Sequence, residues 1–363
     1  MKVYRIAVFG MAHLHAGILL NDFKRLGNKI EIIGYTDYLP CNDFERRIKE
    51  SLKYTQLPEY YENPEDLIAL KPDIGIVCCD NASHKDVAVS LMENGIIPII
   101  EKPLAFNIQD AIDIYEVSKK TGVQFITNWP VAWFPPFKYA KKIFDEGVIG
   151  RPLRFIYRTT ATLGPYSYDG PRKFDEYECS SWWYNSERGG GALIDYCGYG
   201  SILSTYFLDE CPYEVYGHKR RFMMPDNAGD VEDYAMLTLQ FENTVGYAEG
   251  SWSTPAIGCN KTGPIIYGTD GVIVCNRYDN IVEVYTDRNS NKPTQSYTCD
   301  EQSETVLENL VSHLDNGTEL NPMLLPKVNM WVAAVLDAGI RSCKSGVPEK
   351  TLNYLKLGES ENE

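Results

Sequence analysis

The sequence predicts two domains of mixed class: an α/β domain with a doubly wound parallel sheet, then an α+β domain with a large, mainly antiparallel open sheet. Three observations support this prediction. The chain has 363 residues, enough for two domains that each bury a core. Over residues 1–127, apolar runs of strand length alternate with helical patterns. From residue 128 on, strand-like segments dominate instead, so we expect domains at 1–127 and 128–363.

In the first domain, helical patterns separate five apolar runs of strand length. The third run, residues 74–79, is apolar throughout, which is typical of a strand buried on both faces of a parallel sheet. Gly27 ends the first helical pattern, and Pro64 stands where a short helix begins. The expected strands are 3–9, 30–36, 74–79, 96–100 and 123–127, and the expected helices are 18–26, 44–52, one from residue 64, 82–94 and 108–120.

The second domain begins with an amphipathic helix, 137–146, which Gly147 ends. Asp270-Gly271 is a hairpin signal between two later strands. The remaining expected strands are 153–162, 213–221, 234–241, 245–252, 264–268, 272–276 and 281–285, and the expected helices are 193–208 and 328–343. These few helices cannot cover both faces of a broad apolar sheet. We therefore expect a homodimer or homotetramer that buries the uncovered face.

Composition excludes several classes of partner. Fifty acidic against 35 basic residues give a net charge of -15, which argues against a nucleic-acid or anionic membrane surface. The opening MKVYRIAVFG carries a charge and a turn too early for a signal peptide, and no apolar stretch approaches the length of a membrane span. The ten cysteines are scattered without a C-x-x-C pair, so we expect reduced thiols and a cytoplasmic protein.

A loop between the first strand and the first helix has the position of the dinucleotide-binding G-x-G-x-x-G turn of Rossmann domains. It reads Gly10-Met11-Ala12-His13-Leu14-His15, so that alanine replaces the second glycine and histidine the third. Asp37 closes the next strand, where a carboxylate accepts hydrogen bonds from a ribose diol and repels a 2'-phosphate, so we expect NAD rather than NADP. The alternative is an ordinary tight turn with Asp37 as a loop acid.

The two histidines of this loop raise the question of a metal ion. His13 and His15 are ligand types that bind transition metals, but the sequence shows no acid or thiol cluster to match them. We therefore expect no metal site.

Two further motifs follow buried strands, where polar groups of a parallel sheet face the ligand crevice. Asn81 and His84 stand after the third strand, and Asn81 could alternatively cap the following helix. Glu101-Lys102-Pro103 ends the fourth strand. Lys102 is thus placed over the crevice with Glu101 beside it, and Pro103 fixes the backbone direction in a form that could be cis.

A glycine run opens the helix of the second domain that carries candidate catalytic groups. The stretch GGGALIDYCGYG covers residues 189–200, and its glycines allow close approach of the backbone. Asp195 and Tyr199 are four residues apart and are expected on one face of that helix, where an acid and a phenol could share a hydroxyl substrate. The alternative is a core helix in which Asp195 serves the helix dipole. Trp182, Trp183 and Tyr184 could be core residues or the wall of a sugar site.

Taken together, these stretches resemble the glucose–fructose oxidoreductase, inositol dehydrogenase and rhizopine catabolism family, Gfo/Idh/MocA, over nearly the whole chain. The resemblance rests on the opening strand-loop-helix, Asn81-x-x-His84, EKPLA at 101–105, IFDEGVIGRPLRF at 143–155 and GGGALIDYCGYG. It implies a usually oligomeric NAD(P)-dependent oxidoreductase acting on sugars or cyclitols. Cys197 and Tyr199 stand where the family usually has glycine and histidine. The resemblance and the two motifs together place these residues at the cofactor: Gly10, Ala12, His13, Asp37, Asn81, His84, Glu101 and Lys102.

The sequence therefore predicts an NAD-dependent dehydrogenase or reductase of a sugar, cyclitol or related polyhydroxylated molecule. Its expected catalytic residues are Lys102, Asp195 and Tyr199, with Lys102 or Tyr199 handling the hydroxyl proton. One alternative is an enzyme that cleaves glycosides with tightly held NAD and no net redox change. Another is a non-catalytic dinucleotide-binding regulator.

Overall fold

The structure is a computed structural model of the chain, and it describes residues 2–13, 15–37, 59–160, 182–224, 226, 229–254, 263–299 and 303–357. These residues form two compact units. The first comprises 1–129, 180–189 and 304–329, and the second comprises 130–179, 190–303 and 330–363. The predicted boundary between residues 127 and 128 falls just before the end of the first of these ranges. The helix predicted at 44–52 lies outside the described residues.

The first unit contains the predicted five-stranded parallel sheet, with strand order β2-β1-β3-β4-β5. Its central strand β3 is buried at every residue, as its continuous apolar sequence predicts. The order reverses at β1, so the crevice between the carboxyl ends of β1 and β3 is the expected ligand site. The strands are β1 Tyr4–Phe9, β2 Ile30–Thr36, β3 Ile74–Val77, β4 Ile97–Glu101 and β5 Ile126–Asn128.

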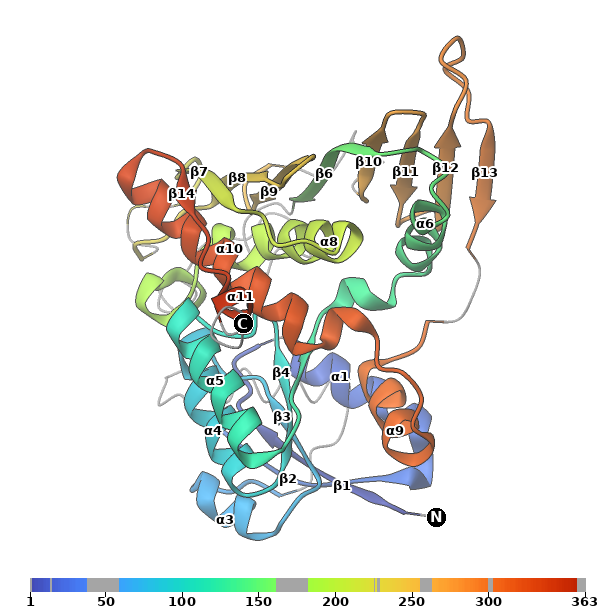
Figure 1. Cartoon of the computed structure of the whole chain (residues 1–363). Coiled ribbons are helices and arrows are strands. Elements are labelled where there is room, and N and C mark those ends of the chain that lie inside the picture. The colour runs from blue at the N-terminus through green and yellow to red at the C-terminus, as the bar shows by residue number, and fades with distance from the viewer. Residues whose placement is uncertain are drawn as a thin grey trace. The chain divides into compact units, whose positions relative to one another are not determined.

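Helices lie on both sides of this sheet, with α4 and α5 on one side and α1 and α9 on the other (Figure 1). The α5 helix shows local control of its ends: the Asn107 side chain accepts the backbone N–H of Asp110, and Gly122 ends the helix in the left-handed conformation. The helices are α1 His15–Phe23, α3 Pro64–Ala69, α4 His84–Glu93, α5 Ile108–Thr121 and α9 Val306–Asn316, and 3₁₀ turns cover Lys24–Lys29, Asn81–Ser83 and Pro322–Leu324.

The second unit is built on a nine-stranded sheet with the order β13-β12-β11-β10-β6-β9-β8-β7-β14. All neighbours are antiparallel except β6 and β9, so the prediction of a mainly antiparallel sheet is confirmed. The strands are β6 Pro152–Thr160, β7 Glu214–Arg220, β8 Tyr234–Gln240, β9 Val245–Ser251, β10 Ile265–Gly268, β11 Val272–Asn276, β12 Ile281–Tyr285, β13 Gln295–Thr298 and β14 Glu349–Lys350.

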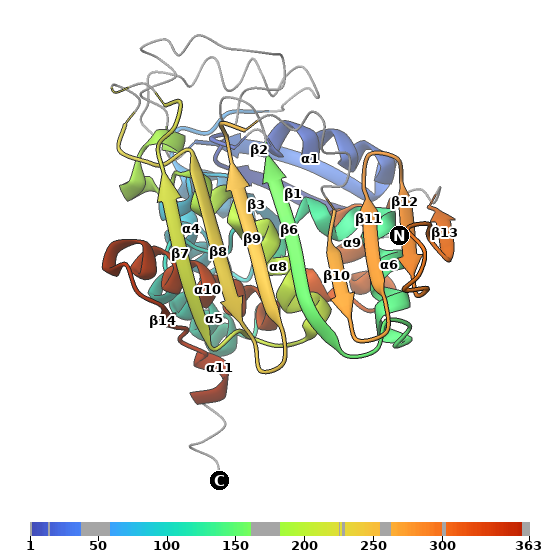
Figure 2. The ribbon, with the colours of Figure 1, turned by 90° about the horizontal axis from the view of Figure 1, so that it is seen from above.

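One face of this sheet packs on helices α6, α8 and α10, and Figure 2 shows the other face, which no described helix covers. Burial alternates along β8 and β9, as expected for a sheet with one buried face. The helical elements of this unit are α6 Pro135–Asp145, α8 Gly198–Leu208, α10 Pro326–Ser345 (which starts in the first unit), α11 Tyr354–Leu357, 3₁₀ turn Pro130–Trp133 and π-helical turn Leu193–Cys197. Within the first unit, two more 3₁₀ turns cover Trp182–Tyr184 and Ser186–Arg188.

The helix predicted at 193–208 is present. Its first turn is not α-helical, however, because Leu193–Cys197 form a π-helical turn. This turn packs tightly on β9, where a Cβ at Gly250 would lie 2.8 Å from the carbonyl oxygen of Ala192. Single π-turns inside helices are frequent at functional sites. In the described part of the chain, no helix is long and apolar enough to cross a membrane.

Candidate active site

The glycine loop joins β1 to α1 and packs on the end of β3. Gly10 has φ 94°, and a Cβ there would lie 2.5 Å from the backbone nitrogen of Cys79. The Gly10 N–H donates to Thr36 O at 2.9 Å, and the Ala12 N–H donates to Cys78 O at 3.0 Å. The first glycine of the motif is therefore required both by its backbone conformation and by its neighbour.

We expect Gly10→Ala to destabilise the protein by about 2 kcal/mol or more. The alanine would have to adopt a positive φ, which strains its backbone, and its Cβ would also clash with backbone atoms of Cys79. Chemical denaturation followed by tryptophan fluorescence measures the change in the free energy of unfolding. Gly27→Ala is the matched control, since Gly27 also has positive φ but its Cβ would meet no described atom within 4 Å. Equal losses in the two variants would contradict the packing argument.

Asp37 lies directly beside this loop. It follows β2, and its Oδ1 accepts the backbone N–H of Met11 at 3.4 Å. The carbonyl oxygen of Ala12 accepts the indole N–H of Trp182 at 3.0 Å. The loop is thus in contact with both a carboxylate and an aromatic side chain.

His13, His15 and Glu101 form a cluster within the first unit, which corrects the expectation that no acid accompanies the two histidines. The Nδ1 of His15 lies 2.8 Å from Oε1 of Glu101, and the rings of His13 and His15 are 4.2 Å apart between centroids. One ligand atom from each of the three lies within 4.8 Å of the others, so the set could hold a metal ion. The sequence missed this cluster because Glu101 is far along the chain and reaches the loop only when β4 joins the sheet.

Lys102 follows β4 and is buried, with 2% of its surface exposed. Its ammonium lies 5.9 Å from the centroid of the Trp183 ring, within the range of a cation–π interaction. The Lys102–Pro103 peptide bond is cis, as the sequence allowed. His84 is fully buried beneath this turn, and its Nδ1 lies 3.0 Å from the carbonyl oxygen of Pro103. His84 therefore supports the turn that carries Lys102.

Residues 182–189 are held against the end of β3 by polar contacts that the sequence did not reveal. The Asn81 amide donates to the carbonyl oxygen of Gly189 at 2.8 Å, so Asn81 does not cap a helix. Asp80 is the capping residue and accepts the Ser83 N–H, and it forms a 2.8 Å ion pair with Arg188. The stretch is therefore fixed beside the residues that follow β3.

Several buried polar atoms in this unit have no hydrogen-bond partner among the described residues, and three of them belong to predicted cofactor residues: Nε2 of His13, Oδ1 of Asn81 and Nε2 of His84. Buried polar groups in folded proteins are nearly always paired, so unpaired groups near the carboxyl edge of one parallel sheet, such as those of His13 and Asn81, fit a site for a polar ligand. The glycine at the end of β1 fits the pyrophosphate of a dinucleotide, and Asp37 after the next strand fits its ribose.

The second unit contains the other predicted catalytic residues. Asp195 lies in the π-helical turn, is 4% exposed, and its Oδ2 accepts the indole N–H of Trp252 at 3.1 Å. Tyr199 lies in α8, half-buried, with its ring 6.3 Å from that of Tyr196. The sequence did not identify the two groups that hold this turn. They are Trp252 and Glu232, whose side chain accepts the Leu193 N–H at 2.9 Å.

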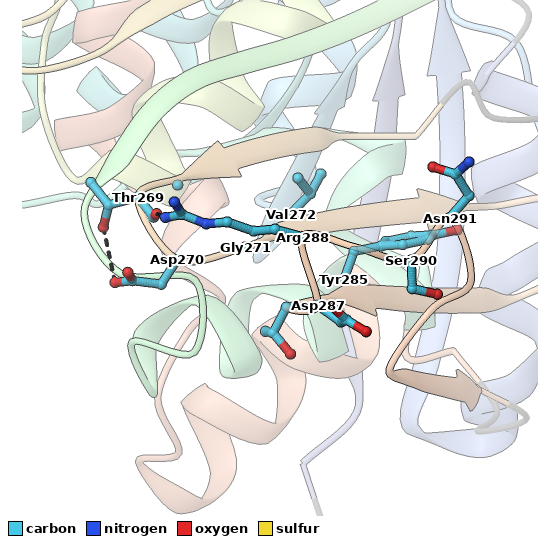
Figure 3. A pocket seen from close by; sticks show the side chains of 11 residues that line it. Thr269, Asp270, Gly271, Val272, Tyr285, Asp287, Arg288, Ser290 and Asn291 are labelled. Atoms are coloured by element: carbon cyan, nitrogen blue, oxygen red, sulfur yellow. Dashed lines mark hydrogen bonds between the residues drawn. The ribbon is translucent and has the colours of Figure 1, made fainter.

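A separate cavity of about 510 Å³ lies between the β10–β11 turn and the segment that joins β12 to β13 (Figure 3). Arg288 crosses it and donates to the carbonyl oxygen of Thr269 at 2.7 Å. Turn residues line it, and none of the predicted catalytic or cofactor residues is among them. The cavity therefore has no part in the candidate active site.

Two family models match the chain. A model described as "Oxidoreductase family, NAD-binding Rossmann fold" matches residues 5–129, and one described as "GFO/IDH/MocA C-terminal domain" matches residues 137–274. These ranges contain every predicted site residue.

Curated relatives include enzymes of inositol metabolism. The chain is 24% identical to inositol 2-dehydrogenase/D-chiro-inositol 3-dehydrogenase of Lactiplantibacillus plantarum, over 48% of this chain and 49% of the relative. It therefore spans about half the length of that relative. The identity to scyllo-inositol 2-dehydrogenase (NAD(+)) of Bacillus subtilis is 25%, over 74% of this chain and 72% of that enzyme.

Among solved structures, an oxidoreductase domain protein from Kribbella flavida superposes with a TM-score of 0.79, covering 97% of this chain and all (100%) of that one. The sequence identity is 18%, so this likeness shows the fold alone.

Proposed function

The chain belongs to the Gfo/Idh/MocA family of NAD-binding oxidoreductases, and from this we propose that it transfers a hydride between NAD and a CH–OH group of a cyclitol, sugar or related polyhydroxylated molecule. The inositol dehydrogenases among its relatives support this substrate class. The described cysteines are free thiols, which supports the cytoplasm as its compartment.

The observation that carries the proposal is the buried cation Lys102 at the carboxyl edge of the parallel sheet, next to the carboxylate of Glu101. When bound, NAD would accept the hydride that leaves the substrate carbon. The residues that would line the bound NAD are Gly10, Ala12, His13, Asp37, Asn81 and Glu101. His84 would contribute indirectly, by holding the Pro103 turn that carries Lys102. Lys102 would donate to the substrate hydroxyl oxygen and stabilise the negative charge that develops there as its proton leaves. Asp195 would orient a hydroxyl by accepting its hydrogen.

A screen of inositols, aldoses and sugar acids with NAD, read by absorbance of the reduced cofactor, tests this function. Substrate-dependent formation of NADH is the expected result. Cleavage of a glycoside without net NADH would instead indicate the non-redox alternative. Dinucleotide binding without turnover of any of these compounds would indicate a regulator.

We expect NADH to bind at least about tenfold more tightly than NADPH, because the Asp37 carboxylate would repel a 2'-phosphate. Titration of tryptophan fluorescence measures both affinities. Asp37→Ala should narrow the difference by weakening NADH binding and relieving the repulsion. Tighter binding of NADPH than of NADH by the wild type would contradict this prediction. Residues 38 and 39, which follow the carboxylate, lie outside the described residues.

We also propose that a second copy covers the open face of the nine-stranded sheet. Ile156, Met236 and Tyr247 point to that face and are partly exposed. We expect light scattering at micromolar concentration to give two or four times the chain mass. Tyr247→Glu, which places a charge on this face, should lower that mass. A monomeric wild type would overturn the proposal.

A further inference from the structure

His15 and Glu101 form a carboxylate–imidazole pair at the crevice edge of the first unit. Glu101 is fully buried, and both of its oxygens are held: Oε1 lies 2.8 Å from Nδ1 of His15, and Oε2 accepts the amide of Asn128 at 2.9 Å. Burial alone would raise the pKa of Glu101, but His15, Lys102 and Asn128 together hold it below its ordinary value. The carboxyl group is therefore ionised.

This ionised carboxylate determines which nitrogen of the His15 ring carries the hydrogen. A carboxylate can only accept, so Nδ1 of His15 must donate to it. In the neutral ring, Nε2 then keeps its lone pair. No hydrogen bond to Nε2 is found among the described residues, and 19% of the side chain is exposed. His15 thus presents a proton-accepting nitrogen at the crevice, on a ring whose orientation a buried carboxylate fixes.

The neighbouring His13 contacts this pair as a neutral ring whose hydrogen position can also be assigned. Burial lowers the pKa of His13 well below its ordinary value, and the charges of His15 and Lys102 act in the same direction, so its ring is neutral. Its Nδ1 accepts the backbone N–H of His15 at 3.1 Å, which fixes the start of α1. His13 therefore carries its hydrogen on Nε2.

These hydrogen positions disfavour a metal ion in the cluster. A ligating nitrogen needs a free lone pair, but Nδ1 of His13 is already an acceptor and its Nε2 is protonated. Moving that hydrogen to Nδ1 would set it against the His15 N–H. The positive charge of Lys102, which acts on His13 and Glu101, also opposes a cation here. The geometry fits proton transfer better than metal binding.

We propose that His15 is a catalytic residue of the dehydrogenation and takes the proton of the substrate hydroxyl on Nε2, while Glu101 orients the ring and stabilises the imidazolium. The proposal rests on the proposed function. In this step the O–H bond breaks and its proton passes to Nε2. NAD, when bound, would accept the C–H electron pair as hydride, and the carbon–oxygen bond would become a carbonyl. The proton then leaves His15 for solvent. Lys102 stabilises the oxygen rather than taking its proton.

His15→Ala in the full-length protein tests this role with the best substrate of the screen. We expect kcat to fall at least about a hundredfold, the size of a general-base contribution, while the NADH dissociation constant stays within about threefold. Added imidazole should restore at least a tenth of the lost activity in His15→Ala and none in Lys102→Ala, because only the former leaves a ring-sized space at Oε1 of Glu101, where an imidazole can donate its hydrogen. Tyr199→Phe should lose less than tenfold. His313→Ala, at the surface end of α9, is the control and should behave as the wild type.

Several outcomes would overturn the proposal. A kcat for His15→Ala within threefold of the wild type would do so, as would parallel losses of kcat and NADH affinity without rescue, which would make His15 a cofactor ligand. A stoichiometric metal ion in the purified wild type that is absent from His15→Ala would show that His15 is a metal ligand, and this would overturn the proposal. If His15→Ala does not fold, His15→Gln is measured in the same way without the rescue. A wild type that turns over no compound overturns the proposed function and this inference with it, whereas an active wild type with an unaffected variant overturns the inference alone.

Discussion

Replacing Lys102 with alanine is expected to lower kcat by about a thousandfold or more and to leave the NADH dissociation constant within about tenfold. The ammonium is buried at the end of β4, where it would be most effective at stabilising negative charge on the substrate oxygen. That charge develops only as the reaction proceeds, so its loss should appear in kcat and not in cofactor binding. Stopped-flow NADH formation and fluorescence titration measure the two quantities.

Lys138→Ala is a matched control for this variant. Lys138 also lies over an indole, 5.5 Å from the centroid of the Trp133 ring, but its side chain is exposed on α6. It should keep wild-type activity. Lys102→Met retains the aliphatic length without the charge and should fail as severely as alanine. More than a tenth of the wild-type kcat in either Lys102 variant would exclude a charge-stabilising role.

Asp195 gives the second large effect, because its charge and its hydrogen bond can be removed separately. In Asp195→Asn the amide oxygen can still accept from Trp252 Nε1, so the turn should keep its stability while kcat falls at least about a hundredfold. Asp195→Ala should lose activity as well and also leave the buried indole N–H unpaired, at a cost of about 1–3 kcal/mol. Thermal unfolding and steady-state kinetics of both variants separate the effects.

Trp252→Phe provides the complementary change, since it removes the donor and keeps the carboxylate. We expect a smaller loss, about tenfold, from a carboxylate that is no longer held in position. Wild-type kcat in Asp195→Asn would mean that the acid serves only the packing of the turn, and its catalytic assignment would then be wrong.

The parallel sheet could be predicted closely because its signals are local. Each strand is an apolar run and each helix carries its own start and stop, such as Gly122 after α5. The helix α9 could also have been predicted, because Thr305 and Glu308 form a capping box that is visible in the sequence. The strand β13 could not have been predicted, since its residues are mostly exposed and show no apolar alternation.

The polar contacts of the site were beyond prediction for a different reason. Asp80 and Arg188 are far apart in the chain, and so are His15 and Glu101, so neither pair leaves a spacing pattern. The sequence left Asn81 open as an alternative cap, whereas the adjacent Asp80 is the capping residue, because both residue types cap helices equally well. The π-helical turn at Asp195 also has no local signature, since it depends on the close approach to Gly250.

The path of the chain between the two units has a consequence for folding. Residues 180–189 and 304–329 belong to the first unit, although each is preceded and followed by chain of the second. In the first unit, the buried indole of Trp129 donates to Asn329 at 2.7 Å, so residues two hundred positions apart complete one core. A fragment ending at residue 129 would lack this partner together with Trp182 and α9. The unit that would hold the dinucleotide therefore cannot finish folding during synthesis until most of the chain has emerged.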